Sequence, residues 1–185
     1  MQYFQKIAEG IGVAPVMAQL NEHLELWDQH PFRTRLGPDG PFDRTSDIWI
    51  RWRPLNDLKE PKDFNAPHFA VFYPAWENLP ALHGVVFAIM AAVRATHLGA
   101  ILITRVPPGV SIKPHNDRGG WNAETMDTKV YLTIKTNPYV ETYCEDERIV
   151  MREGDVWAFN NLVTHGLDNR GETERVSAII TMRTF

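Results

Sequence analysis

The chain has very little cysteine, with Cys144 alone among its 185 residues. A single thiol cannot form a disulfide within the chain, so the fold must be stable without covalent cross-links. A protein without disulfides fits a reducing compartment, and we therefore expect a cytoplasmic location. The first twelve residues agree with this expectation, because Gln5, Lys6 and Glu9 interrupt the apolar stretch that a signal peptide needs.

Long apolar runs and clusters of one charge are also absent. The longest apolar run, residues 85–93, has nine residues, whereas a membrane-spanning helix needs about 20. We therefore expect this run to be buried in a soluble fold that does not enter a membrane. The 19 basic and 23 acidic residues give a net charge of −4. The basic residues are scattered rather than gathered in a run, so we expect no nucleic-acid partner.

The length and the hydrophobic content fit one domain. The chain has 185 residues, of which 44% are hydrophobic, and a domain has roughly 150 residues. We predict a single domain over residues 1–185. Within it, residues 1–99 show a mixed pattern that indicates a helical support region, and residues 100–185 show the pattern of a β-rich core.

Two helices are predicted in the first half. Residues 13–29 carry apolar side chains at the three- and four-residue spacing of an amphipathic helix. Pro31 and the glycine- and proline-rich residues 37–41 follow it as a loop. Residues 79–98 are rich in Ala, Met and Leu, and Gly99 stands where a helix terminator is expected.

Short runs of β-branched and aromatic residues, separated by turn residues, dominate the second half. Strands are predicted at residues 47–53 and 69–73, and then at 101–106, 111–114, 129–136, 141–143, 148–151, 155–160, 164–168 and 175–183. Many short strands at this spacing are typical of a jelly roll, in which two sheets wrap face to face. We therefore predict a mainly β fold with flanking N-terminal helices, a double-stranded β-helix.

The residues most suggestive of chemistry are His115, Asp117 and His165. On an extended backbone His115 and Asp117 point to the same side while Asn116 points away. His165 follows fifty residues after His115, and a jelly roll can place it on the adjacent antiparallel strand. A lone histidine is usually structural. Two imidazoles and one carboxylate, however, form the ligand set with which non-haem oxygenases hold iron(II) and leave coordination positions open.

Arg175 strengthens this hypothesis. It stands ten residues after His165 and begins the last predicted strand. A guanidinium at the inner end of a strand needs a partner, and a carboxylate fits its planar fork best. Two kinds of carboxylate partner are possible for Arg175: Glu172 or Asp168 in a structural salt bridge, or the distal carboxylate of 2-oxoglutarate.

With these residues the chain resembles the 2-oxoglutarate and iron(II)-dependent oxygenases, and within them the aspartyl/asparaginyl β-hydroxylase family. The resemblance covers about residues 101–184. Residues 108–115 resemble the family's segment before the first ligand, and residues 153–161 resemble the segment before the second. The resemblance implies that His115, Asp117 and His165 bind iron and form the catalytic centre, and that Arg175 holds the C5 carboxylate of 2-oxoglutarate.

The resemblance extends to the surroundings of the cosubstrate, and the residues themselves suggest a substrate pocket. Lys129 and Tyr131, on one face of a strand, match positions near the cosubstrate, and Thr104 matches more weakly. In the loop after the metal carboxylate, Trp121 and Asn122 are candidates for the substrate pocket. Four arginines are candidates for binding an acidic group of the substrate, the alternative for each being a solvated surface position: Arg51, Arg53, Arg105 and Arg118. The remaining histidines lack ligand-like spacing and are interpreted as structural: His23, His30, His68, His83 and His97.

Two departures from the family pattern restrict the implied reaction. The animal β-hydroxylases lack the carboxylate ligand that Asp117 supplies here, and its presence also disfavours halogenation. Asp127 replaces a basic residue that grips an acidic substrate side chain, so hydroxylation of protein Asp or Asn does not follow. Cupins of the isomerase or storage type share the barrel but have a second histidine where this chain has Asp117.

The expected protein is therefore a dioxygenase that uses Fe(II), 2-oxoglutarate and O2 to hydroxylate an unactivated C–H bond. An amino acid or a small amino-acid derivative is the expected substrate, because so short a chain leaves little surface for docking a protein. The alternative is a non-enzymatic or cupin-type jelly-roll protein that binds a small molecule.

Overall fold

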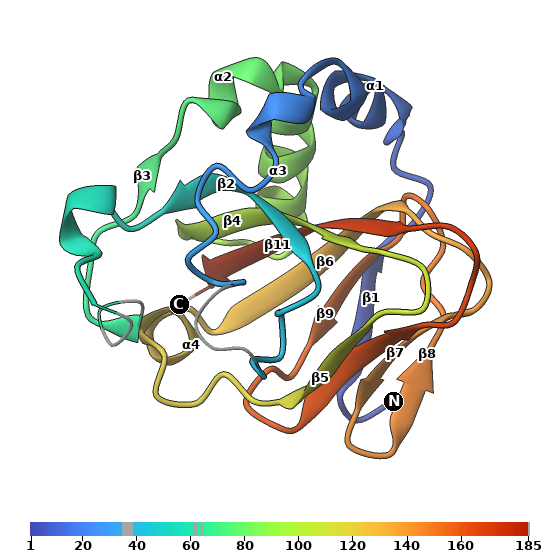
Figure 1. Cartoon of the computed structure of the whole chain (residues 1–185). Coiled ribbons are helices and arrows are strands. Elements are labelled where there is room, and N and C mark those ends of the chain that lie inside the picture. Colours follow the sequence, from blue (N-terminus) through green and yellow to red (C-terminus); the bar gives the residue numbers. More distant parts are fainter. Residues whose placement is uncertain (35–38, 61–62, 64, 185) are drawn as a thin grey trace.

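The computed structural model describes residues 1–34, 39–60, 63 and 65–184 (Figure 1). Residues 37 and 38 of the predicted loop at 37–41 lie outside this part. Two sheets make up the fold, and every strand pair within them is antiparallel. The mainly β jelly roll with flanking N-terminal helices, predicted from the sequence, is thereby confirmed.

The larger sheet has the strand order β1-β9-β6-β11-β4-β2-β3. Its strands are β1 (Phe4–Ala8), β2 (Ser46–Trp52), β3 (Val71–Phe72), β4 (His97–Val106), β6 (Thr128–Lys135), β9 (Val156–Phe159) and β11 (Arg175–Arg183). The smaller sheet has the order β5-β10-β7-β8. Its strands are β5 (Ser111–His115), β7 (Val140–Cys144), β8 (Glu147–Ile149) and β10 (His165–Asn169).

The helices α1 (Ala14–Glu22) and α3 (Pro80–Ala92) cover the outer face of the larger sheet. Shorter helices are α2 (Ala75–Asn78) and α4 (Trp121–Thr125). The described residues also include the 3-10 helices η1 (Leu24–Leu26) and η2 (Leu55–Asp57). Figure 1 shows α1 and α3 on one side of the larger sheet and the smaller sheet on the other. None of the described helices combines the length and apolarity that crossing a membrane requires.

Strand β11 shows how the two faces of the larger sheet are divided. Val176, Ala178, Ile180 and Met182 are buried in the main core with residues of α1 and α3. Side chains alternate along a strand, so Arg175, Ser177, Ile179 and Thr181 face the interior between the two sheets. The ionisable side chain of Arg175 therefore lies between the two sheets.

The helix predicted at residues 13–29 is shorter than expected. Helix α1 ends at Glu22, and the chain continues through His23 into the 3-10 turn η1. Leu24, which continued the apolar spacing, is 63% exposed. The apolar spacing of the sequence therefore continues past Glu22, but Leu24 does not pack against the core as a helix residue would.

The helix predicted at residues 79–98 also ends early, and the interpretation of Gly99 was wrong. Helix α3 ends at Ala92, Arg94 has a positive φ of 56°, and His97 already begins β4. Gly99 lies within that strand. A Cβ at this position would overlap Thr181 Oγ1 and lie 3.0 Å from the Thr181 carbonyl oxygen. Gly99 therefore permits β4 to pass close to β11 rather than ending a helix.

Other expectations need smaller corrections. Strand β1 was not predicted, strand β3 has two residues instead of five, and helix α4 forms where a loop was expected. The remaining predicted strands agree to within a few residues at either end. Strand ends are set partly by the partner strand, which local sequence does not reveal.

Two glycines give opposite predictions for stability. Gly99→Ala should lower the free energy of unfolding by about 1–3 kcal/mol, because the added methyl group overpacks the contact with Thr181. Gly84→Ala should raise it by about 0.5–1 kcal/mol, because Gly84 lies within α3 and nothing lies within 4 Å of the added Cβ. Urea unfolding followed by circular dichroism measures both. Equal stability of Gly99→Ala and the wild type would contradict the close passage of β4 and β11.

Candidate active site

His115, Asp117 and His165 meet at one end of the smaller sheet. His115 ends β5, His165 begins β10, and the two residues lie opposite each other in the antiparallel pair. Their ring centroids are 4.3 Å apart. Asp117 follows two residues after β5, and one ligand atom from each of the three residues lies within 4.8 Å of the others. The fold thus brings together residues that the sequence separates by fifty positions.

Backbone carbonyls orient both imidazoles. His115 Nδ1 lies 2.8 Å from the Lys113 carbonyl oxygen, and His165 Nδ1 lies 3.0 Å from that of Val163. A carbonyl oxygen only accepts, so Nδ1 carries the proton and Nε2 keeps a free lone pair. Burial lowers the pKa of His115, and it lowers the pKa of His165 to about 4. Both rings are therefore neutral near pH 7 and able to bind a metal.

The two oxygens of Asp117 have different surroundings. Oδ1 lies 3.8 Å from His115 Nε2 and 4.0 Å from His165 Nε2. Oδ2 accepts hydrogen bonds from Lys129 Nζ at 2.5 Å and from Asn161 Nδ2 at 2.9 Å. Burial opposes ionisation, but the charge of Lys129 outweighs it with help from His165 and these hydrogen bonds, and the Asp117 pKa falls well below its usual range. Asp117 is an anion whose Oδ1 faces the two imidazoles.

These residues fit a divalent transition metal. His165 Nε2 is buried and has no hydrogen-bond partner among the described residues. A buried polar atom without a partner is unfavourable, and a metal ion would satisfy it. Two neutral imidazoles and one carboxylate are the donor set of non-haem iron(II) sites with open positions. Asn116 is not part of the group, because its side-chain oxygen accepts from the Arg118 N–H at 3.2 Å.

Arg175 lies in the interior without an acidic partner. Its side chain is 2% exposed, and the Nε atom has no partner among the described residues. The nearest contacts are Met151 Sδ, 3.5 Å from one terminal nitrogen, and the Tyr131 ring, whose centroid is 5.1 Å from Cζ. In the described part of the chain, the alternative salt bridge with Glu172 or Asp168 is not formed. Burial lowers the pKa of Arg175 to about 10, so it remains a cation at neutral pH.

Two further polar groups on the interior faces lack partners. Ser177 follows Arg175 on the same face of β11, and Thr133 lies opposite Ser177 on β6. Both hydroxyl oxygens are buried and, among the described residues, have no hydrogen-bond partner. A buried guanidinium and two free hydroxyls along adjacent strands would suit a carboxylate-bearing ligand. The sequence analysis named neither hydroxyl, although alternation along the strands puts Ser177 on the face of Arg175 and Thr133 on the face of Tyr131.

The other predicted cosubstrate residues have protein partners. Tyr131 stacks on Phe159, with ring centroids 4.5 Å apart. Lys129 is bonded to Asp117 as described above. The Thr104 hydroxyl lies 2.8 Å both from Asp47 Oδ1 and from a terminal nitrogen of Arg33, within a buried network.

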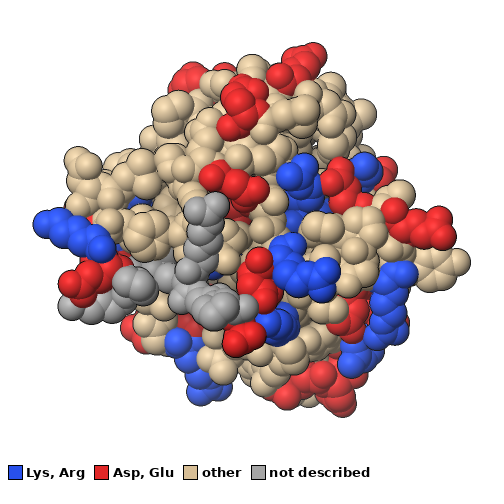
Figure 2. All heavy atoms as spheres, in the orientation of Figure 1, with Lys and Arg blue, Asp and Glu red and all other residues tan. Residues whose placement is uncertain are grey.

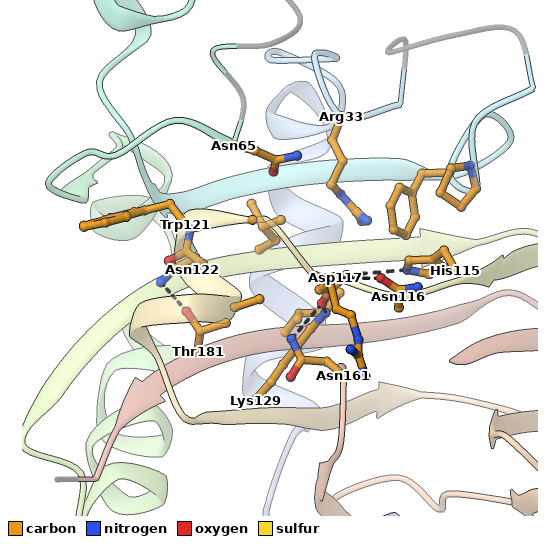
Figure 3. Close-up of a pocket in the computed structure, with 18 of the residues that line it drawn as sticks. Arg33, Asn65, His115, Asn116, Asp117, Trp121, Asn122, Lys129, Asn161 and Thr181 are labelled. Atoms are coloured by element: carbon orange, nitrogen blue, oxygen red, sulfur yellow. Dashed lines mark hydrogen bonds and ion pairs between the residues drawn. The ribbon is translucent and has the colours of Figure 1, made fainter. Parts of the chain in front are cut away.

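A cavity of about 250 Å³ opens beside the metal-ligand residues (Figure 3). The predicted substrate residues Trp121, Asn122 and Arg118 all line it. Trp121 is held by a 2.9 Å hydrogen bond from Nε1 to the His68 carbonyl oxygen, and Arg118 by a 2.7 Å bond from Nε to that of Leu162. All three residues are thus in a position to contact a molecule in the cavity.

Sequence reasoning missed two residues of this site. Arg33 lines the cavity, forms a buried salt bridge with Asp47 at 2.8 Å, and stacks over the Phe42 ring. Asn161 binds Asp117. Arg33 lies in a loop region without periodicity and had no local signal. Asn161, by contrast, is the last residue of the segment 153–161 that carries the family resemblance, and its place there was a signal that could have identified it.

Several other candidates lie elsewhere. Arg51, Arg53 and Arg105 do not line the described cavity, and Arg105 lies 3.8 Å from Glu174. Asp127 accepts a hydrogen bond from the Thr184 N–H at 3.0 Å and is likewise absent from the cavity wall. Figure 2 shows basic and acidic side chains interspersed on the face in view, without a continuous basic patch.

The comparisons with known proteins agree with this geometry. A model of the aspartyl/asparaginyl β-hydroxylase family matches residues 70–184, which include the three ligand residues and Arg175. No curated protein matches the chain in sequence.

Solved structures with a similar fold include three oxygenases. One is an oxidoreductase of the 2OG-Fe(II) oxygenase family from Burkholderia pseudomallei, with 18% identity, a TM-score of 0.54, and coverage of 96% of this chain and 92% of that chain. A viral collagen prolyl hydroxylase from Paramecium bursaria Chlorella virus-1, solved with 2OG, has 11% identity, a TM-score of 0.59, and coverage of 99% and 96%. A Pseudomonas putida prolyl-4-hydroxylase has 13% identity, a TM-score of 0.54, and coverage of 98% and 92%.

At these identities the structural likeness concerns the fold alone. The family match covers more than half of the chain and includes every residue of the metal-ligand group. The chain belongs to the aspartyl/asparaginyl β-hydroxylase family.

Proposed function

We propose that this protein is a 2-oxoglutarate- and Fe(II)-dependent dioxygenase that hydroxylates an unactivated C–H bond. One observation carries the proposal: a group of two neutral imidazoles and one carboxylate shares the barrel interior with Arg175, a buried cation that has no acidic partner in the described chain. The first feature suits iron(II), and the second suits a dicarboxylate. The viral relative solved with 2OG supports the same assignment.

The roles of the residues follow from their positions. His115, His165 and Asp117 Oδ1 would hold the iron, and Arg175 would pair with the distal carboxylate of 2-oxoglutarate. Bound iron(II) and 2-oxoglutarate together would supply the activation of dioxygen. The protein contributes orientation and a largely apolar interior: Arg175 lies over the Tyr131 ring, Tyr131 stacks on Phe159, and Phe159 packs edge-on against His165.

The cavity supports a small substrate, as expected for an amino acid or a small derivative. Its volume of about 250 Å³ is below the roughly 300–1,000 Å³ of pockets for drug-sized ligands. Trp121 and Ile179 offer apolar surface, and Asn122 offers hydrogen bonds. Asp117 is the one acid among the described residues that line the cavity. An anionic or zwitterionic substrate would therefore meet no repelling carboxylate other than the metal ligand.

The test is succinate formation. Metal-free protein supplied with Fe(II), ascorbate, 2-oxoglutarate and O2 should form succinate slowly even without a primary substrate. Addition of the correct amino acid should raise the rate and give a product 16 mass units heavier, so a panel of amino acids is screened by mass spectrometry. Binding of 2-oxoglutarate without any turnover would favour the binding-protein alternative. The absence of both turnover and iron binding would refute the dioxygenase.

A further inference from the structure

We propose that Asn161 is a positioning residue for the metal-binding carboxylate: it holds Asp117 so that Oδ1 faces the two imidazoles. The inference rests on the metal site of the proposed function and adds a residue that no ligand pattern contains. It concerns metal affinity, so it is testable without knowledge of the primary substrate.

Asn161 forms two hydrogen bonds with Asp117. Its side-chain Nδ2 donates to Asp117 Oδ2, and its backbone carbonyl accepts from the Asp117 N–H, both at 2.9 Å. The second bond fixes the backbone of Asp117, and the first fixes the rotation of its carboxylate. Both residues lie outside regular strands, since β5 ends at His115 and β10 begins at His165. The strand pairing that orients the histidines therefore does not orient Asp117, and Asn161 supplies that constraint (Figure 3).

The choice of oxygen matters for the metal. A carboxylate has two oxygens with about four lone-pair sites. Two donors, Lys129 and Asn161, occupy Oδ2. Oδ1 is the oxygen nearest both histidine Nε2 atoms. The arrangement therefore presents a single oxygen to the metal and leaves the remaining coordination positions for other ligands.

Asn161 and Lys129 are not equivalent in this role. The Lys129 ammonium carries a positive charge, which opposes a nearby metal cation, whereas the Asn161 amide is neutral and directs the carboxylate without that repulsion. The family resemblance also implies a place near the cosubstrate for Lys129. If Lys129 turns towards a carboxylate of 2-oxoglutarate, Asn161 is the donor that remains on Asp117 Oδ2.

The preceding residue provides a matched control. Asn160 has the same side chain, but its oxygen accepts from the Leu162 N–H at 3.0 Å, and its backbone N–H donates to the Tyr3 carbonyl oxygen at 3.0 Å. It does not contact Asp117. Removal of either asparagine side chain deletes one hydrogen bond in the same loop, and only the deletion at Asn161 affects the metal ligand.

The experiment is a titration of metal-free protein with Co(II), followed by its visible absorption. Asn161→Ala should weaken Co(II) binding about tenfold or more, since loss of a group that orients a ligand costs roughly 10–100-fold in metal affinity. Asn160→Ala should stay within about twofold of the wild type, on the same scale. The melting temperature without metal should fall to a similar extent in both variants, whereas the increase on adding Co(II) should shrink only for Asn161→Ala.

A double-mutant cycle tests whether the effect passes through Asp117. In an Asp117→Ala background, Asn161→Ala should weaken Co(II) binding no further. The same loss in both backgrounds, or wild-type affinity in Asn161→Ala, would overturn the positioning role while leaving the metal site intact. Failure of the wild type to bind Co(II) would overturn the metal site and the proposed function with it.

Discussion

Asp117→Ala is expected to abolish 2-oxoglutarate turnover while the fold survives. The substitution removes the anion from the group of three ligand residues and leaves two neutral imidazoles. Loss of a group that merely orients a ligand weakens metal binding about 10–100-fold, so loss of the ligand itself should exceed about 100-fold. Iron binding and succinate formation, measured on the same preparation, should fall together.

Asp117→Ala has a second effect besides loss of the ligand, since it leaves a buried cation without its partner, and a second variant removes that effect. Asp117→Ala leaves the Lys129 ammonium, whose side chain is 13% exposed, without its acid. The double variant Asp117→Ala/Lys129→Met leaves no unpaired charge, and it should be equally inactive if loss of the ligand is the cause.

Asp127→Asn is the matched control. Asp127 is an acid at the Thr184 backbone, outside the cavity wall, and the variant should retain turnover close to the wild type. If Asp117→Ala kept more than a tenth of the turnover, the carboxylate would not be an essential ligand. The chain would then work with two histidines, as the animal β-hydroxylases that it resembles do.

The metal-ligand group could be predicted because its geometry follows from local rules. Alternation along β5 and the recurrence of turns after residue 100 were enough to predict a jelly roll with His115 and His165 on neighbouring strands. The pairing of the two histidines needs the class of fold but no particular side-chain contact, and the sequence specifies that class strongly. Asp117 could be named from its spacing to His115, but it lies beyond the end of β5, and its carboxylate is held by Lys129 and Asn161, which the spacing does not reveal.

Other features depend on contacts between distant residues. Gly99 follows a helical pattern, and its true role is decided by Thr181, which is 82 residues away in the sequence. Arg33 is placed by Asp47 and Phe42; the strand predicted at residues 47–53 includes Asp47 but does not indicate that Arg33 is its partner. Lys129 lies on the strand face predicted for it, but the partner of its ammonium depends on where the loop carrying Asp117 and Asn161 comes to rest. Such contacts are formed by tertiary packing, which periodicity does not encode.

Arg175→Met is expected to weaken binding of 2-oxoglutarate strongly and at the same time to stabilise the ligand-free protein. Burial lowers the Arg175 pKa from 12.5 to about 10. One pKa unit corresponds to about 1.4 kcal/mol, so the buried charge costs on the order of 3 kcal/mol. The folded-state pKa lies below the unfolded one. This cost is therefore fully present at neutral pH, and it decreases only as the pH rises through about 10.

Methionine fills much of the same volume without a charge, although it loses the contact with the Tyr131 ring. Replacement of a buried charge by an apolar residue of similar size is often neutral or stabilising by 1–4 kcal/mol. We expect a gain of about 1 kcal/mol for Arg175→Met in urea unfolding without metal or cosubstrate. Binding of 2-oxoglutarate should weaken at least about 30-fold, because truncating one partner of a buried charge pair costs 2 kcal/mol or more.

Arg105→Met is the control for loss of an arginine. Arg105 lies in β4 opposite Val176, and its side chain is 30% exposed near Glu174. Its removal should leave the affinity for 2-oxoglutarate unchanged. Calorimetry with 2-oxoglutarate and Mn(II), which occupies the metal site without turnover, measures both variants. Unchanged affinity in Arg175→Met would refute the anchor. A buried cation whose only partner is its ligand should destabilise the ligand-free protein. If Arg175→Met lost both affinity for 2-oxoglutarate and much of its free energy of unfolding, the guanidinium would therefore have a structural partner within the protein.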